Sequence, residues 1–322
     1  MHILVLSSPV TGALDETGAA GRAFLDAHPE CQWRFVDSKD CTPADIRWAD
    51  VITGHPNPAW LKDAPRLKWL HLQSAGVNGY ERRELYASDS VLVTRAAGVH
   101  GLAIAEHAIA MALGLCRRLP ELYVQQRNHR WQPVTAHYTL SGSRVLVLGA
   151  GYLADALVER LQGFGCRITC LRRDRSKPIP AGCQGVVTAA ELPEALAEAD
   201  FLFNTLPLTP ATKGLLGEAA FRRMKPSLIL VNVGRGGTMD HTALTAALQE
   251  NRIAGAGLDV TDPEPLPPDS PLWDLPNVLI TPHCSAWSDE TDRRRGQVFL
   301  RQLDKFLRRE PLDGQIDFSA GY

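Results

Sequence analysis

The stretch Arg144-Val-Leu-Val-Leu-Gly-Ala-Gly-Tyr-Leu-Ala154 decides the fold of this chain. Five residues of β-strand type run into a Gly-x-Gly-x-x-Ala turn, and a helical pattern follows. In such a strand–turn–helix, Gly149 makes the tight turn, and Gly151 lets the backbone approach a pyrophosphate. The helix that starts at Tyr152 and Leu153 offers N–H donors and a positive dipole end to the phosphates. The stretch therefore predicts a dinucleotide site in a parallel α/β sheet, with an ordinary glycine-rich turn as the alternative.

Short apolar runs alternate with helical patterns along the chain, which favours parallel sheets covered by helices on both faces. Strands are expected at residues 3–6, 51–53, 70–72, 91–94, 144–148, 167–171, 201–204, 229–232 and 278–281. An Ala-rich helix is expected over 101–118, a polar irregular stretch over 125–143, and a charged, amphipathic helix over 289–309. The length of 322 residues suggests two domains, because a domain usually has about 100–200 residues.

The composition is that of an ordinary globular protein, with 45% hydrophobic and 22% charged residues and a net charge of −2. This balance gives no electrostatic reason to bind nucleic acid or an anionic membrane. Residues 96–116 are apolar enough to imitate a membrane span, but they contain His100 and Glu106 and consist largely of Ala and Gly. A buried or interface helix is therefore expected there. Residues 1–8 indicate a first strand rather than a signal peptide, which points to the cytoplasm.

The seven cysteines show no Cys-x-x-Cys and no Cys/His spacing typical of a metal site, so no metal is expected. Cys166 and Cys170 fall on one predicted strand. At about 3.3 Å per residue they lie about 13 Å apart, which is too far for a disulfide. We interpret the cysteines as free thiols in a reducing compartment.

The strand that follows the glycine turn decides between the two nicotinamide dinucleotides. An NAD site has a carboxylate at the end of this strand for the ribose 2′-OH, whereas this strand ends in Arg172 and Arg173. Guanidinium groups bind a 2′-phosphate through charge-assisted hydrogen bonds, so NADP(H) is the expected cofactor. Asp174 follows directly and would serve NAD(H) if the strand ran longer. Surface arginines without a ligand are the remaining alternative.

Four islands of sequence follow at or near predicted strand ends, at residues 206–209, 231–236, 258–266 and 281–283. Ligands of open α/β sheets bind at the carboxyl ends of the strands, so Arg235, Glu264 and His283 are expected to converge. An Arg–Glu–His set suits the reduction of a 2-oxo acid. The arginine pairs with the carboxylate and polarises the carbonyl, the histidine gives the carbonyl oxygen a proton, and the glutamate keeps the histidine protonated.

With these motifs in this order, the chain resembles the D-isomer-specific 2-hydroxyacid dehydrogenases over about residues 51–310. The subgroup most similar to it is the NADP-linked glyoxylate/hydroxypyruvate reductase-like one. The resemblance includes the further motifs Leu67-Lys-Trp-Leu70, Ser74-Ala-Gly-Val-Asn78, Gly98-Val-His-Gly101 and Ala105-Glu-His107. It implies NADPH-dependent reduction of a small 2-oxo acid, such as glyoxylate or hydroxypyruvate, to the D-2-hydroxy acid.

The resemblance also implies a domain organisation that the residues alone do not show. Residues 1–98 and 286–322 would form a substrate domain, and the inserted residues 99–285 a dinucleotide-binding Rossmann domain. Both would be doubly wound α/β domains around a parallel sheet. The long helices near 101–118 and 290–309 would cross between the domains. The family is usually a homodimer, in which the first of these regions packs against the partner.

Residue by residue, the resemblance implies that Arg235 orients the substrate, that His283 is the acid/base and that Glu264 is its carboxylate partner. The substrate carboxylate would bind the backbone N–H groups of Ala75 and Gly76. The residues expected near the cofactor are Asp259, beside the nicotinamide carboxamide, and Pro207 and Val233, whose backbone contacts it.

Three residues depart from the pattern of the family and leave the exact substrate open. They are Asn78, Arg95 and Thr261, where the family often has Asp, Asn and Phe. His100 and His107 have no motif support and are interpreted as structural, and Glu106 as a buried carboxylate that ties the domains together. In the reductase-like subgroup, a tryptophan matching Trp131 reaches the partner's active site. An apolar interface residue is the equal alternative for Trp131.

Two other functions fit the same motifs. Phosphite or formate oxidation would use the same frame, although formate enzymes of this group have Gln at the position of Glu264. A nucleotide-sensing protein similar to the C-terminal-binding corepressors would also retain the three polar residues. This chain shows neither long extra tails nor a basic patch to favour that second function.

Overall fold

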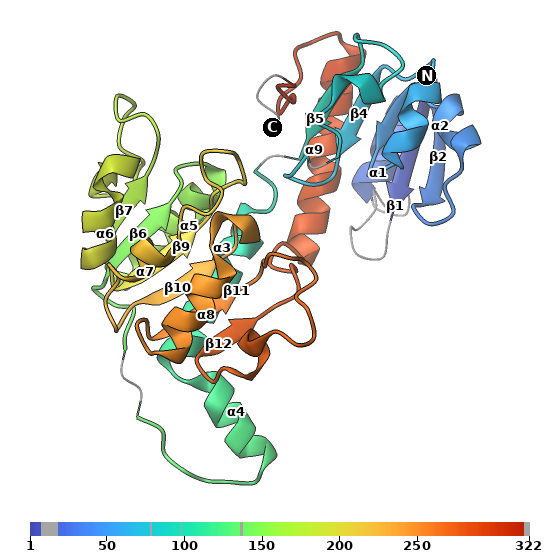
Figure 1. Cartoon of the computed structure of the whole chain (residues 1–322). Coiled ribbons are helices and arrows are strands. Elements are labelled where there is room, and N and C mark those ends of the chain that lie inside the picture. The colour runs from blue at the N-terminus through green and yellow to red at the C-terminus, as the bar shows by residue number, and fades with distance from the viewer. Residues whose placement is uncertain (8–18, 78, 97, 136–137, 319–322) are drawn as a thin grey trace. The chain divides into compact units, whose positions relative to one another are not determined.

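The computed structural model describes residues 1–7, 19–77, 79–96, 98–135 and 138–318 (Figure 1). The chain divides into two compact units, Met1–His100 with Trp287–Tyr322, and the inserted Gly101–Ala286. Each unit contains one sheet whose strands are all parallel. The predicted fold class, two parallel-sheet α/β domains with one inserted into the other, is therefore confirmed. The functional boundaries 1–98 with 286–322, and 99–285, stay a prediction.

The first unit is built around a five-stranded sheet in the order β2-β1-β3-β4-β5. Its strands are β1 (His2–Ser7), β2 (Gln32–Asp37), β3 (Val51–Thr53), β4 (Trp69–Leu72) and β5 (Leu92–Arg95). Its helices are α1 (Ala19–Ala27), α2 (Pro43–Trp48) and α9 (Asp289–Leu307), with short 3₁₀ turns at Pro58–Asp63 and Arg83–Leu85. Successive strand residues point to opposite faces. Ile3 and Val5 thus join one apolar cluster with Phe299 of α9, while Leu4 and Leu6 join another with Ile46 of α2.

The inserted unit is built around a seven-stranded sheet in the order β12-β11-β10-β9-β6-β7-β8. Its strands are β6 (Arg144–Leu148), β7 (Arg167–Leu171), β8 (Gly185–Val187), β9 (Phe201–Asn204), β10 (Ile229–Asn232), β11 (Gly255–Leu258) and β12 (Val278–Ile280). Its helices are α3 (Gly101–Cys116), α4 (Leu119–Arg127), α5 (Tyr152–Leu161), α6 (Leu192–Glu198), α7 (Glu218–Phe221) and α8 (His241–Gln249). Short 3₁₀ turns lie at Gln162–Phe164, Ala189–Glu191, Gly236–Thr238 and Pro271–Asp274.

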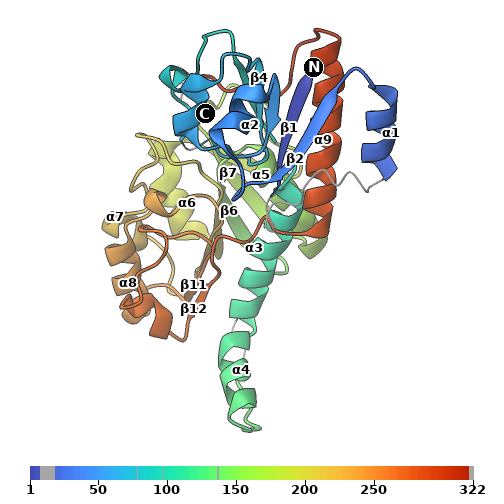
Figure 2. The same ribbon diagram turned by 90° about the vertical axis from the view of Figure 1, so that its right-hand side faces the viewer.

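Helices cover both faces of this sheet. Residues of α3 and α5 form one apolar cluster with the strands, and residues of α6, α7 and α8 form the other. The order of the strands reverses between β6 and β9, because the chain adds β7 and β8 on one side and the later strands on the other. Figure 2 shows α4 continuing from the end of α3 away from the sheet.

All nine predicted strands occur, and five of them have the predicted bounds. The sequence did not predict β2, β8 and β11. Strand β8 has only three residues, and β2 mixes polar with apolar side chains. Strand β11 consists of Gly-Ala-Gly-Leu, a composition with low β propensity. Small residues are required there, because a Cβ at Gly257 would lie 3.0 Å from the Cβ of Met111 on α3.

The Ala-rich helix α3 is mostly buried within its unit, as predicted, and ends at Cys116. Glu106 on this helix does not fit the prediction of a buried carboxylate. Its side chain is 65% exposed, and its nearest cation is Arg160, with 3.9 Å between Oε1 and Nε. The reason is its register, because Ala110 and Arg117 lie on the same outward stripe of the helix and its extension. Among the described residues, no helix is both long enough and apolar enough to cross a membrane.

The core of the first unit contains a histidine with no contact to water. His71 of β4 is 1% exposed, and its Nδ1 lies 2.8 Å from Oγ1 of Thr94. That hydroxyl oxygen accepts a hydrogen bond from Nε1 of Trp69 at 2.8 Å, so its own proton is free to be donated to a neutral His71. Burial lowers the pKa of His71 to about 4.

We expect His71→Leu to make the protein less sensitive to acid. The folded protein keeps His71 neutral down to about pH 4, whereas the unfolded chain takes up the proton near pH 6.5. Stability is therefore lost as the pH falls through this window. When the pH falls from about 7 to about 5, the unfolding free energy of the wild type should drop by about 2 kcal/mol because of this residue. The variant should not show this drop. Urea unfolding at both pH values measures the difference.

The matched control for this experiment is His129→Asn. His129 is exposed, and its φ of 52° also suits asparagine, so its replacement should leave the acid sensitivity of the wild type unchanged. An equal loss of stability on acidification in His71→Leu and in the wild type would contradict the assignment.

Candidate active site

The carboxyl ends of all seven parallel strands of the inserted unit lie at one edge of its sheet. The predicted residues follow these ends, with Gly149 after β6, Arg172 after β7, Pro207 after β9, Val233 and Arg235 after β10, Asp259 after β11 and His283 after β12. The point where the strand order reverses, between β6 and β9, is where open α/β sheets bind ligands. The topology thus places every predicted site residue of this unit, except Glu264, directly at one edge, and Glu264 lies on the loop that follows Asp259.

The turn after β6 has the geometry that the glycine motif predicts. Gly149 has a φ of 114°, and a Cβ there would lie 2.6 Å from Oγ1 of Thr205, which follows β9. The same Thr205 hydroxyl donates to the carbonyl of Leu148 at 2.9 Å. Gly151 is the N-cap of α5, so the first N–H groups of that helix face the turn. Only glycine can therefore occupy position 149, where β6 and the loop after β9 meet.

The loop after β7 contains Arg172, Arg173 and Asp174, the charged residues on which the predicted choice of cofactor depends. Arg172 donates from Nε to the carbonyl of Asp174 at 2.6 Å and from a terminal nitrogen to the carbonyl of Pro178 at 2.7 Å. The Asp174 carboxylate accepts from the backbone N–H and the hydroxyl of Ser176, which lowers the pKa of Asp174. Arg173 is exposed. The Asp174 carboxylate and the Arg172 guanidinium are thus both engaged within the loop, while Arg173 is exposed next to the strand end.

Two buried asparagines fix the loops after β9 and β10, and the sequence analysis did not predict them. Asn204 donates to Oδ1 of Asn232 at 3.0 Å and to Oγ1 of Thr238 at 2.7 Å. The Asn232 amide donates to the carbonyl of Arg235 at 3.2 Å, and its oxygen accepts from the N–H of Gly234 at 3.0 Å. A signal was present, since both strands end their apolar runs in Asn. Which partners these amides have depends on the strand order, which the sequence does not show.

A close approach between two loops brings the arginine and the glutamate to the same edge. A Cβ at Gly236 would lie 2.0 Å from the carbonyl oxygen of Thr261, so the loop after β10 can contact that of β11 only through a glycine. Arg235 directly precedes this contact, and its guanidinium donates to the carbonyl of Gly234 at 2.7 Å. Glu264 lies three residues beyond Thr261.

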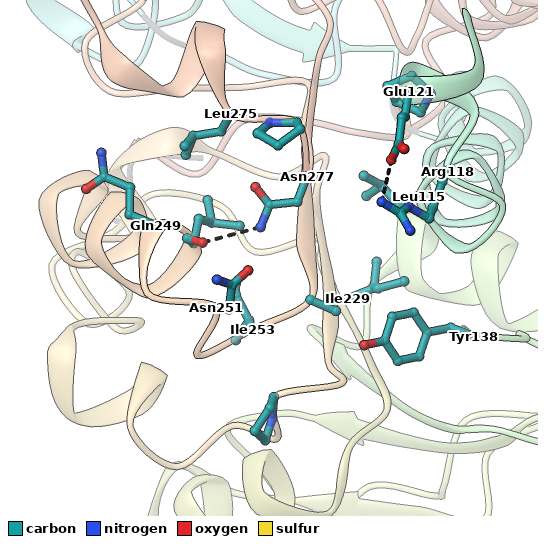
Figure 3. A pocket seen from close by; sticks show the side chains of 15 residues that line it. Leu115, Arg118, Glu121, Tyr138, Ile229, Gln249, Asn251, Ile253, Leu275 and Asn277 are labelled. Atoms are coloured by element: carbon teal, nitrogen blue, oxygen red, sulfur yellow. Dashed lines mark hydrogen bonds and ion pairs between the residues drawn. The ribbon is translucent and has the colours of Figure 1, made fainter. Parts of the chain in front are cut away.

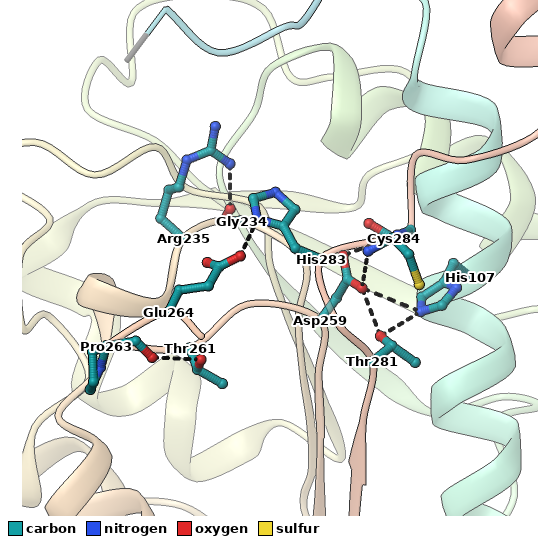
Figure 4. A network of polar contacts seen from close by, with 11 residues as sticks. His107, Gly234, Arg235, Asp259, Thr261, Pro263, Glu264, Thr281, His283 and Cys284 are labelled. Atoms are coloured by element: carbon teal, nitrogen blue, oxygen red, sulfur yellow. Dashed lines mark hydrogen bonds and ion pairs between the residues drawn. The ribbon is translucent and has the colours of Figure 1, made fainter. Parts of the chain in front are cut away.

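His283 and Glu264 form a short hydrogen bond, with 2.5 Å between Nδ1 and Oε1 (Figure 4). Their side chains are 46% and 40% exposed, so both can be reached by a small molecule. His283 has a φ of 50°, and its N–H donates to the carbonyl of Asp259 at 2.8 Å. The structure thus brings the predicted histidine and carboxylate together and orients the imidazole through Nδ1, leaving Nε2 for a ligand.

The Asp259 carboxylate is 1% exposed and accepts hydrogen bonds from the residues on both sides of His283. Its Oδ1 accepts from the hydroxyl of Thr281 at 2.7 Å and from the N–H of Cys284 at 3.0 Å, and its Oδ2 accepts from the N–H of Ser285 at 3.2 Å. His107 of α3 joins this group, with Nε2 at 2.9 Å from Oγ1 of Thr281 and 3.8 Å from Asp259. His107, interpreted from the sequence as structural, thus lies in the support of the His283 loop.

In the first unit, the loop after β4 contains Ala75 and Gly76. Its carbonyl groups are engaged, because Arg95 donates to the carbonyl of Ala75 at 3.0 Å and the hydroxyl of Ser74 to that of Gly76 at 2.6 Å. Within the described part of the chain, no acceptor contacts the N–H groups of Ala75 and Gly76. Arg95, one of the departures noted in the sequence, therefore helps to shape this loop. Asn78, the other departure here, lies outside the described residues.

His55 supports the same loop, with Nε2 at 2.9 Å from Oγ1 of Ser74. Burial, together with the nearby charge of Arg295, lowers the pKa of His55. A neutral His55 donates this hydrogen bond, because the Ser74 hydroxyl proton already points to Gly76.

A cavity of about 450 Å³ in the inserted unit lies at the opposite edge of the sheet (Figure 3). It is lined by Ile229, the first residue of β10, and by Asn277, which directly precedes β12. Arg118 and Glu121 form an ion pair on its α4 side. None of the predicted site residues lines this cavity. Elsewhere, no cluster of three His, Cys, Asp or Glu residues suited to a metal ion occurs in the described ranges.

Comparison with known sequences identifies relatives over most of the chain. A sequence profile of the D-isomer specific 2-hydroxyacid dehydrogenase, NAD binding domain, matches residues 109–285. The glyoxylate reductase of Korarchaeum cryptofilum is 35% identical over 281 residues, which are 84% of this chain and 81% of that protein. The human glyoxylate reductase/hydroxypyruvate reductase is 30% identical over 312 residues, which are 92% and 94% of the two chains.

Solved structures resemble this one along almost its whole length. A D-isomer specific 2-hydroxyacid dehydrogenase family protein from Aeromonas salmonicida has a TM-score of 0.84 at 31% identity, covering 98% of this chain and 99% of that one. The NADPH-dependent glyoxylate/hydroxypyruvate reductase of Sinorhizobium meliloti, solved with NADP and sulfate, has a TM-score of 0.80 at 25% identity, covering 100% and 99%.

We expect Asp259→Asn to destabilise the protein and to release the loop of His283. The asparagine cannot accept at both positions, so either Ser285 or Thr281 and Cys284 lose an acceptor. A buried donor without an acceptor costs about 1–3 kcal/mol. Thermal unfolding should show a lower Tm, whereas the exposed control Asp269→Asn should unfold as the wild type does. A variant with an unchanged Tm would show that these hydrogen bonds do not hold the loop.

Proposed function

Since the chain belongs to the D-isomer specific 2-hydroxyacid dehydrogenase family, we propose that it reduces a small 2-oxo acid, of the size of glyoxylate or hydroxypyruvate, to the D-2-hydroxy acid with NADPH. Membership makes the protein an NAD(P)-dependent oxidoreductase. The observation that carries the proposal is the 2.5 Å hydrogen bond between Nδ1 of His283 and Oε1 of Glu264, at the strand edge that also bears Arg235. Two relatives named as glyoxylate reductases, 35% and 30% identical, support this substrate class.

His283 is the group that we assign to proton transfer. The Glu264 carboxylate accepts a hydrogen bond from Nδ1–H and so orients the imidazole, which leaves Nε2 to give a proton to the carbonyl oxygen of the substrate. Bound NADPH supplies the hydride for the carbonyl carbon. We assign to Arg235 the binding of the substrate's carboxylate and carbonyl groups, because a guanidinium can bind both through charge-assisted hydrogen bonds. The reverse reaction, oxidation of the hydroxy acid, would use the same groups, and the proton of the hydroxyl group would return to His283.

The substrate carboxylate requires donors, and the first unit offers two. The N–H groups of Ala75 and Gly76 have no acceptor within the described part of the chain, while the carbonyls beside them are already engaged. Adjacent unpaired N–H groups form a concavity that attracts anions. We therefore propose that residues 1–98 and 286–322 supply the substrate domain, and residues 99–285 the dinucleotide-binding domain.

For the cofactor we propose the edge between β6 and β9. The pyrophosphate would lie at the glycine turn and the N-terminus of α5, and the nicotinamide and its ribose along the loops after the later strands. The residues assigned to it are Gly149, Gly151, Tyr152, Leu153, Pro207, Val233 and Asp259. Arg172 and Arg173 favour NADP(H), because the nearby carboxylate of Asp174 is engaged with Ser176. NAD(H) would bind without the 2′-phosphate contacts.

A homodimer is part of the proposal, and α4 supports it. On this helix, Leu119, Tyr123 and Val124 are more than half exposed. A cavity lined partly by Pro120 and Glu121 of the same helix lies next to them. A group of exposed apolar side chains next to such a cavity is typical of a surface that another chain covers. A second copy would cover both in a symmetric dimer. The compartment that we expect, from the seven cysteines without ligand spacing, is the cytoplasm.

The first test of the function is turnover with NADPH and a set of 2-oxo acids, combined with Glu264→Gln. Glutamine keeps the shape but not the charge, so kcat should fall by about 10²-fold or more. The exposed control Glu250→Gln should leave kcat unchanged. Binding of NADPH without turnover, or oxidation of phosphite or formate instead, would refute the proposal.

The choice of cofactor is tested by the double variant Arg172→Ala/Arg173→Ala. Without the guanidinium groups, the KM for NADPH should rise far more than the KM for NADH, since only NADPH has the 2′-phosphate. The arginine pair Arg222→Ala/Arg223→Ala, at the end of α7, is the matched control for the loss of two charges. Equal kcat/KM values for the two cofactors in the wild type would contradict the assignment.

Trp131 tests whether the partner completes the substrate pocket. Its side chain is fully exposed in the single chain, at 101%. If it narrows the pocket of a second copy, Trp131→Ala should shift kcat/KM from small towards bulky 2-oxo acids while the dimer survives size-exclusion chromatography. The control is Trp273→Ala, another tryptophan that is half exposed. An unchanged substrate ratio would remove Trp131 from the pocket, and a weakened dimer would make it an interface residue.

A further inference from the structure

Two cysteine side chains meet beside the loop that contains Arg172 and Arg173. Cys170 is fully buried in β7, and Cys183 is half-buried just before β8. Their sulfur atoms are 2.9 Å apart. The described cysteines are all free thiols. Only Cys166 and Cys170 share a predicted strand in the sequence, whereas Cys183 follows a loop whose course the spacing does not show.

We propose that Cys170 and Cys183 are an oxidisable dithiol, which a peroxide converts into a disulfide that closes the loop between β7 and β8. The modification site itself stands on the geometry of this pair. Its consequence for the cofactor rests on the proposed function, because it concerns the 2′-phosphate of NADPH.

The backbone on both sides of the pair is fixed, so the approach of the two sulfurs is built into the fold. Cys170 is held in the ladder between β6 and β8. Next to Cys183, the N–H of Gln184 donates to the carbonyl of Ile168 at 2.8 Å, and its side-chain oxygen accepts from the N–H of Ile168 at 2.5 Å. A disulfide has an S–S distance of about 2.05 Å, so closing it requires the sulfurs to move by less than about 1 Å.

The two thiols differ in reactivity. The contact with Cys183, together with burial, raises the pKa of Cys170, whereas the contact with Cys170 lowers the pKa of Cys183. Cys183 is also the more exposed of the two. Because the thiolate is the nucleophile, Cys183 is the sulfur that an oxidant meets first.

The chemistry proceeds in two displacement steps. The Cys183 thiolate attacks one oxygen of hydrogen peroxide, the O–O bond breaks, and the leaving hydroxide takes up a proton to become water, which gives a sulfenic acid on Cys183. The sulfur of Cys170 then attacks the sulfenic sulfur, the S–O bond breaks, and the hydroxide leaves as water with the Cys170 proton. Overall, two thiols and one peroxide give one disulfide and two waters.

Closing this loop should weaken the binding of NADPH. Two nitrogens of Arg172 are tied to carbonyls of the loop, and the remaining one is buried with no partner among the described residues. To reach a 2′-phosphate, this guanidinium has to turn outward, which requires residues 174–178 to move. A disulfide from Cys170 to Cys183 spans all of them and restricts that motion, so oxidation should raise the KM for NADPH severalfold and that for NADH less.

The test treats the reduced, full-length protein with hydrogen peroxide and follows thiols and mass. The thiol count of the denatured protein should fall from seven to five per chain. Trypsin digestion without reductant should give residues 168–172 linked to 176–213, and dithiothreitol should separate them. Cys183→Ser should not give this linked species, whereas Cys166→Ser, which removes a buried thiol on the same segment, should form it as the wild type does.

Kinetics with NADPH and NADH before and after oxidation complete the test, with oxidised Cys183→Ser as the control for other thiols. If both thiols stay free or the linked peptides involve other cysteines, the dithiol is refuted. If the disulfide forms but the KM for NADPH stays constant, its coupling to the cofactor is refuted. Absence of any turnover with NADPH would refute the proposed function alone, because the thiol count and the linked peptides do not depend on activity.

Discussion

The buried carboxylate of Asp259 is the constraint on which the rest of the candidate site depends. A carboxylate removed from water must be fully hydrogen-bonded, and here three donors from the following strand and loop satisfy it. These hydrogen bonds also fix the backbone on both sides of His283. The imidazole can then be exposed to solvent and still be oriented, because the order comes from the charge beneath it and from Glu264 beside it.

The same arrangement, buried hydrogen-bonded residues beneath a more exposed polar side chain, recurs along the edge of the sheet. The amides of Asn204 and Asn232 are fully buried, while Arg235, three residues beyond Asn232, is partly exposed. Contacts that only a glycine allows, such as Gly236 against Thr261, bind neighbouring loops to each other without a side chain between them. Rigid support under accessible polar groups is what a catalytic site requires.

Apolar runs predicted the strands well, because parallel strands that are buried on both faces are apolar throughout. The motif order predicted that His283 and Glu264 would meet, which the structure confirms. The sequence failed where a residue's surroundings depend on strand order or helix register. Strand β11 was not predicted, because its small residues are required by the close packing of Met111 against Gly257. The prediction of a buried Glu106 was wrong, because its side of α3 faces outward. The pairing of Cys170 with Cys183 depends on the loop between β7 and β8 in the same way.

The five-stranded sheet and the helix that covers one of its faces come from opposite ends of the chain, and this affects folding during synthesis. One face of the sheet, with Trp69 and Ile3, is covered by Phe299 and Leu303 of α9. The last strand of the sheet ends at Arg95, so about 200 further residues must leave the ribosome before that face is closed. At about 5–20 residues per second this wait lasts about 10–40 s. During this time the nascent chain exposes an apolar sheet face that α9 covers only afterwards.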